Sequence, residues 1–205
     1  MQYTTLATKE SITKTIAALK EHNVEATVVS NKEEALAAIK QLIPSGASVM
    51  NGSSVTLEQI GFVDYLKSNT HSWNNLHAGI LAEQDKEKQG LLRKQAVLSD
   101  YYLGSVHALA ETGEFIIASN SGSQLPHIVY TSPNLLFVVS TQKIVPNLAE
   151  GMKRLEDYVL PLEDKHMQDL YGIGSGISKV VIFKREKPGS GRTVKMILVE
   201  EQLGF

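Results

Sequence analysis

The feature that most constrains the fold is an alternation of helical and strand-like segments along the first half of the chain. Ile12, Ile16 and Leu19 recur at helical spacing and predict one apolar helix face. The stretch 24–30, VEATVVS, is rich in β-branched residues and predicts a strand, and 31–43 returns to helical spacing after a capping pair. Helices that alternate with strands are typical of an α/β protein with parallel strands.

The second half of the chain changes to closely spaced strands. Segments 106–111 and 114–119 flank a Thr-Gly turn, and the apolar runs HIVY and NLLFVVS follow as further predicted strands. Near the end, KVVIF and VKMILVE flank a glycine-rich basic loop and predict a closing hairpin. We therefore expect an α/β fold with a mixed sheet, parallel at its start and extended by antiparallel strands.

Length and charge exclude several classes of protein. The chain of 205 residues fits one domain, 1–205, with 1–45 as an N-terminal helix–strand–helix part and 46–205 as its main part. The net charge of -2 provides no general attraction for nucleic acid or an anionic membrane. No apolar run approaches the roughly 18 residues of a membrane-spanning helix, and no secretory signal opens the chain, so we expect a cytoplasmic protein.

The chain contains no cysteine. It therefore has no disulfide, no catalytic thiol and no iron–sulfur cluster held by its own thiolates. Its 6 histidines show no i, i+4 pair typical of a zinc-binding helix. The sequence predicts no metal site and no cofactor within the chain.

The segment NGSSVT, 51–56, is the first candidate for ligand binding. It follows a short predicted strand and opens a predicted helix, so its backbone N–H groups and the helix dipole converge on one spot. Gly52, Ser53, Ser54 and Thr56 would surround an anion such as a phosphate or a carboxylate. The alternative is a capped strand–helix turn that binds nothing, and the residues alone leave both interpretations open.

The segment ALAETGEFIIASNSGSQLPHIVY, 108–130, contains the second candidate. Glu111 ends an apolar run, where partial burial would raise its pKa and suit it to proton transfer or nucleophilic attack. His127 follows a proline that fixes the local backbone, and it could act as an acid, a base or a donor to an anion. A structural role stays open for both residues, as a hydrogen-bonded turn glutamate and a hydrogen-bonded core histidine.

Three other polar stretches are less specific. GIGSGISK, 172–179, lacks the spacing of a dinucleotide fingerprint, and KREKPGSGR, 184–192, is explained as well by a solvated loop as by a nucleic-acid contact. The polar segment 84–100 predicts a helix that either faces solvent or docks a partner or a second copy of the chain.

Four stretches together resemble the lactate-utilisation (LUD) domain family. They are NGSSVTLEQIGFVDYL, ALAETGEFIIASNSGSQLPHIVY, LLFVVSTQKIVPNLAEGMKRL and GRTVKMILVEEQLGF, in the family's order. The Glu-Thr-Gly segment followed by Leu-Pro-His is the most specific of them. The resemblance implies a three-layer α/β/α fold with a mixed central sheet, similar to the sugar-phosphate isomerase and CoA-transferase group, in which ligands lie over the carboxyl ends of the strands.

The resemblance also implies a site and a role. Glu111 and His127 would face the reacting carbon of a small anionic metabolite, surrounded by Gly52, Ser53, Ser54, Thr56, Thr112, Gly113 and Ser123. Lactate-utilisation proteins are thought to act with partners in oxidising L-lactate to pyruvate, and any iron–sulfur cluster would here sit on a partner. The chain departs from the family near its end, where GSGISKVVIF replaces a Gly-Pro-Ser-basic-Thr segment, so specificity for lactate stays open.

Two functions therefore stand side by side. The first is an accessory or ligand-binding component in the oxidation of L-lactate or a related small organic acid. The second is a stand-alone isomerase or CoA transferase that uses Glu111 as base or covalent nucleophile, by analogy with the CoA transferases of the same fold group.

Overall fold

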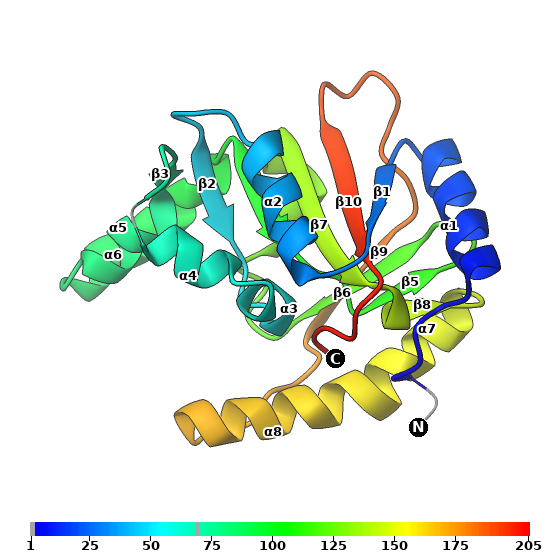
Figure 1. The fold of residues 1–205 in the computed structure, drawn as a ribbon. Helices are drawn as coiled ribbons and strands as arrows, with labels where there is room; N and C mark the ends of the chain where they lie inside the picture. The colour runs from blue at the N-terminus through cyan, green and yellow to red at the C-terminus, as the bar shows by residue number, and fades with distance from the viewer. Residues whose placement is uncertain (1–2, 69) are drawn as a thin grey trace.

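A computed structural model describes residues 3–68 and 70–205 and contains a central sheet of parallel strands (Figure 1). This sheet has the order β1-β10-β7-β4-β2-β3, and every pairing in it is parallel. Its strands are β1 (Glu25–Val29), β2 (Ser48–Asn51), β3 (Asn74–Asn75), β4 (Tyr101–Gly104), β7 (Asn134–Ser140) and β10 (Thr193–Val199).

A second sheet of four strands holds the antiparallel pairings. Its order is β8-β5-β6-β9, with β5 and β9 antiparallel to β6 and β8 parallel to β5. The strands are β5 (Ala108–Ala110), β6 (Phe115–Ser119), β8 (Ile144–Val145) and β9 (Lys179–Phe183). The hairpin expected around the Thr-Gly turn is confirmed, since Leu109 pairs with Phe115.

The helices connect and cover these strands. The α-helices are α1 (Lys9–Glu21), α2 (Lys32–Leu42), α3 (Val55–Gln59), α4 (Phe62–Lys67), α5 (Leu76–Ala82), α6 (Lys86–Gln95), α7 (Leu148–Arg154) and α8 (Leu160–Tyr171). Shorter helical segments are η1 (Ala96–Leu98), η2 (His127–Thr131), η3 (Thr141–Lys143) and η4 (Leu155–Val159). Figure 1 shows α8 as a long arm below the sheets. No helix of the described residues is long and apolar enough to cross a membrane.

The central strand β7 shows why the sequence folds into layers. Its side chains alternate between two faces, and both faces are apolar, as expected for a parallel strand buried on both sides. Leu135 and Phe137 pack in one core with α1 and the second sheet. Leu136 and Val138 pack in another core with α2, α3 and α4. The α/β class expected from the alternating segments is confirmed, with a parallel central sheet flanked by helices.

Two local expectations were wrong. The run HIVY is not a strand but the π-helical turn η2, in which Val129 and Tyr130 are exposed. The closing hairpin does not form either, because β9 pairs with β6 while β10 lies between β1 and β7 in the central sheet. The strand β10 is apolar on both faces, which suits the middle of a parallel sheet better than a hairpin.

Candidate functional site

A cleft of about 590 Å³ opens at the carboxyl ends of the central strands. β2 enters it at Asn51, β4 at Gly104, and β7 through η3 at Lys143. The end of β6 and one side of α8 complete its walls. Ligands of open parallel sheets bind at this edge, and the volume is usual for a small-molecule site.

The cleft gathers most of the residues that the sequence proposed for a site. Those that line it are Gly52, Ser53, Ser54, Thr56, Ser123 and His127. Glu111, Thr112 and Gly113 are not among its lining residues; they lie in the turn between β5 and β6.

The turn after β2 is held in place from both sides. A side chain at Gly52 would collide with the Tyr102 hydroxyl and would come within 2.7 Å of Gln124 Oε1, so only glycine fits there. The Ser54 hydroxyl accepts from the Leu57 backbone N–H at 3.3 Å and caps α3. Ser53 is exposed at the mouth of the cleft. The turn thus presents the capping hydroxyl of Ser54 and the exposed hydroxyl of Ser53.

Lys143 is the most unusual residue of the cleft. It is the last residue of η3, the short helical segment after β7, and its relative exposure is 3%. Its Nζ donates to Thr56 Oγ1 at 3.0 Å and to Ser105 Oγ at 3.2 Å. No carboxylate of the described residues forms an ion pair with it. Burial, followed by the nearby Arg154 guanidinium, lowers the pKa of Lys143 to about 7.

Arg154 adds a second buried cation behind the cleft. It comes from α7, is fully buried, and donates from Nη1 to the His107 carbonyl oxygen. Its Nε and Nη2 have no hydrogen-bond partner among the described residues. The rings of Tyr3 and Tyr158 face the guanidinium, with their centroids 5.9 and 5.2 Å from its carbon. Two buried basic side chains therefore adjoin, and neither forms an ion pair with a carboxylate in the described part of the chain.

Two of the histidines that line the cleft, His107 and His127, are neutral at pH 7. Burial, with the charges of Lys143 and Arg154, lowers the pKa of His107 to about 3, and its Nδ1 accepts from the Ala118 N–H at 3.1 Å. Burial lowers the pKa of His127 to about 4. Neither imidazole offsets or adds to the positive charge of the lysine.

His127 is positioned by packing and by hydroxyl groups. Its ring stacks on Tyr102 at a centroid distance of 4.6 Å. Its Nδ1 lies 3.3 Å from the Ser99 hydroxyl and 3.1 Å from the Ser132 hydroxyl. The residue is thus both a core residue, as the structural alternative held, and part of the cleft lining.

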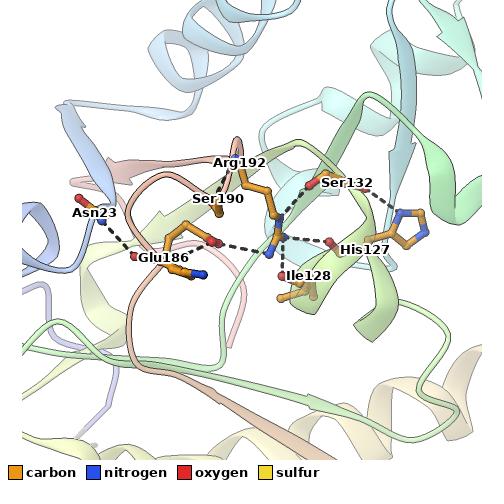
Figure 2. A network of polar contacts seen from close by, with 8 residues as sticks. Asn23, His127, Ile128, Ser132, Glu186, Ser190 and Arg192 are labelled. Atoms are coloured by element: carbon orange, nitrogen blue, oxygen red, sulfur yellow. Dashed lines mark hydrogen bonds and ion pairs between the residues drawn. The ribbon is translucent and has the colours of Figure 1, made fainter.

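A guanidinium at the start of β10 fixes the turn that carries His127, as Figure 2 shows. Arg192 donates to the carbonyl oxygens of His127 and Ile128 at 3.2 and 2.7 Å, and to that of Ser132 at 3.1 Å. Glu186 pairs with the same guanidinium at 3.2 Å. The basic loop before β10 therefore supports the site indirectly, because Arg192 in this loop binds the backbone of the turn that carries His127.

Glu111 does not line the cleft but contacts α1. Its carboxylate accepts from the Lys14 ammonium at 2.8 Å and from the Ser11 hydroxyl at 2.7 Å. These partners hold the pKa of Glu111 below its usual value, so the expectation that burial raises this pKa was wrong. Gly113 has φ of +96° and abuts the backbone of Ala18. The turn is built to dock onto α1.

The α8 wall carries the acidic residue of the described lining. Burial is the main cause that raises the pKa of Glu163. Next to it, the ring of His166 meets that of Phe205 edge-on at 6.1 Å.

Sequence reasoning missed Lys143, Arg154 and His107. The available signal was the position of Lys143, three residues after the end of NLLFVVS, whose central five residues are apolar. At the carboxyl end of such a strand, a lysine points to a ligand site more often than to a solvated surface.

The structure is that of an α/β protein, and its polar cleft lies at the carboxyl edge of the parallel sheet, where ligands of such folds bind. The profile of the LUD domain matches residues 12–191, and the chain belongs to this family. Its fold is similar to the crystal structure of a DUF162 family protein from Deinococcus radiodurans, with a TM-score of 0.55 and 14% identity, over 95% of this chain and 99% of that one. Comparison with curated protein sequences gave no match.

Proposed function

We propose that this protein binds a small organic acid in the cleft and serves the oxidation of L-lactate or a related acid, as the name of the LUD domain suggests. One observation carries the proposal: Lys143 lines the cleft, is buried, and forms no ion pair with a carboxylate of the described residues. A buried cation without a counter-ion is costly, and an anionic ligand would remove that cost.

The surroundings of Lys143 favour a carboxylate of small size. Arg154 increases the positive potential from behind, while Thr56 and Ser105 offer hydroxyl groups beside the ammonium. Ser53 supplies a further hydroxyl at the mouth. Charged donors and short hydroxyls at one end of a cleft recognise a carboxylate better than a neutral sugar or a base.

The redox chemistry of such an oxidation would come from elsewhere. The chain has no cysteine to hold an iron–sulfur cluster, and no group of His, Asp and Glu among its described residues is arranged for a metal ion. We therefore propose an accessory or ligand-binding role next to a partner that carries the electrons. Use of Glu111 as a nucleophile gains no support, since its carboxylate is held by Lys14 and Ser11 outside the cleft lining.

A thermal-shift panel tests the proposal. It contains L-lactate, pyruvate, sugar phosphates and acyl-CoAs, each added to wild type, to Lys143→Met and to Lys195→Met. The last variant is a matched control, because Lys195 lies near the amino end of β10 and pairs with Glu25. A ligand at about 100 times its dissociation constant stabilises the folded state by roughly 2.7 kcal/mol.

The expected result is stabilisation of wild type and of Lys195→Met by small carboxylates, and its loss in Lys143→Met. Equal stabilisation of all three proteins would place the site elsewhere. Stabilisation by acyl-CoA alone would favour the transferase alternative.

A further inference from the structure

We propose that Lys143 is a nucleophilic amine that forms an imine with the carbonyl carbon of a 2-oxo acid bound in the cleft. The inference rests on the proposed function, since it assigns a substrate class to the same site. It goes beyond that function because binding of a carboxylate alone requires no covalent bond.

The first support is the placement of the amine. Lys143 is one of the lining residues of the cleft, beyond the carboxyl end of β7, and its Nζ is fixed by two hydroxyl groups. A surface lysine moves freely through solvent, whereas this one is held at one point where a ligand would meet it. A fixed nucleophile within reach of a bound carbonyl gains the rate advantage of proximity.

The second support is the charge around the amine. An amine attacks a carbonyl only when it is unprotonated, and desolvation beside another cation is the usual way to keep a lysine so. The groups that face Lys143 are Thr56 from α3, Ser105 after β4, Arg154 from α7 and the backbone at Gly204, with His107 nearby. No side-chain carboxylate of the described residues pairs with it. Its pKa of about 7 agrees with this arrangement.

The third support is that the two hydrogen-bond partners of Lys143 Nζ, Thr56 and Ser105, are hydroxyl groups. A hydroxyl can donate as well as accept a proton. In the reaction, the Nζ lone pair forms a bond to the carbonyl carbon while the carbonyl oxygen takes a proton, giving a carbinolamine. The C–O bond then breaks, water leaves with a second proton, and the imine remains. Thr56 and Ser105 are placed to relay these protons. The overall change is amine plus ketone to imine plus water, with no oxidant or reductant.

Formation of the imine would also preserve the positive charge at this position of the site. When protonated it carries the same positive charge as the ammonium, so the carboxylate of the 2-oxo acid stays next to a cation. L-Lactate has the same carboxylate but a hydroxyl in place of the carbonyl, so it can bind without reacting. The two acids therefore separate binding from imine formation.

Reductive trapping tests the inference. The protein is incubated at pH 7 with pyruvate and cyanoborohydride, and the modified peptide is identified by mass spectrometry. We expect one adduct on Lys143, its loss in Lys143→Met, its retention in Lys195→Met, and slower formation when L-lactate competes. The other lysines of the same chain serve as internal controls for non-specific reaction. In Lys143→Arg, which keeps the charge, we expect pyruvate to bind but no adduct to form.

The outcomes distinguish the two proposals. Stabilisation by pyruvate that depends on Lys143, without an adduct on Lys143, would overturn the imine and leave the anion site standing. An adduct spread evenly over surface lysines would overturn it as well. If pyruvate neither binds nor forms an adduct, both proposals are overturned.

Discussion

Replacement of Lys143 by methionine should change how the stability of the protein depends on pH. In the unfolded chain the lysine keeps its proton until the pH nears its ordinary pKa of 10.5, while in the folded protein it loses the proton near pH 7. Above pH 7 the unfolded state therefore binds more protons than the folded state. Because the unfolded state binds more protons, the free energy of unfolding rises with pH, by up to about 1.4 kcal/mol per pH unit.

The magnitude follows from the two pKa values. Between pH 7 and 9 the titration of Lys143 should contribute about 2 kcal/mol of additional stability to wild type. With a urea m-value of about 2 kcal/mol per molar, this corresponds to a relative shift of the midpoint by roughly 1 M. Lys143→Met lacks the titrating amine and should lack this contribution. His107, whose pKa the charge of Lys143 helps to lower, stays neutral between pH 7 and 9 in both proteins.

The assay is urea unfolding of wild type and Lys143→Met at several pH values in this window, with Lys195→Met as control. The quantity to follow is the difference in the free energy of unfolding between wild type and Lys143→Met, plotted against pH. The lost hydrogen bonds to Thr56 and Ser105 change this difference by the same amount at every pH, so its slope reports the titration of Lys143. A difference that does not vary with pH would show that the amine stays protonated in the folded protein. That result would refute the reasoning on its charge.

Three further predictions concern the residues around the cleft. Arg192→Met should cost about 1–3 kcal/mol of stability and move the NMR signals of the His127 imidazole, since buried carbonyls lose a charged donor; unchanged signals would speak against a positioning role. Gly52→Ala should lower the melting temperature through overpacking of about 1–3 kcal/mol against Tyr102, and an unaltered melting curve would show that the turn can shift. Glu111→Gln should lower the free energy of unfolding by about 1 kcal/mol or less, and this difference should fade as the pH falls through the lowered pKa of Glu111. The stabilisation by ligands should be unchanged, and its loss would favour the hypothesis that Glu111 acts in the site.

The sequence predicted the parts of the fold that depend on local periodicity. The strand and helix that follow α1 stand where the spacing of apolar residues placed them, and Asn31 caps α2 as expected. The partners of the last strands could not be predicted, because strand pairing is a non-local choice and KVVIF and VKMILVE look alike in isolation. The turn η2 was missed because its carbonyls are satisfied by Arg192, which is far away in sequence.

The site was predictable to the same extent. The turn at 51–56 and His127 were visible as polar residues beside apolar runs, and they line one cleft. The electrostatic centre was not visible, since the environment of Lys143 comes from Thr56, Ser105 and Arg154 on three other parts of the chain. A pKa depends on that environment, and for the same reason the expected shift of Glu111 had the wrong sign.

The central claim is that Lys143 holds a small organic acid in the cleft, and calorimetric titration with pyruvate and L-lactate tests it most directly. We predict saturable binding of at least one of the two acids to wild type and to Lys195→Met, and a tenfold or greater loss of affinity in Lys143→Met, roughly 1.4 kcal/mol or more. Equal affinities in wild type and Lys143→Met, or no heat from either acid, would contradict the account.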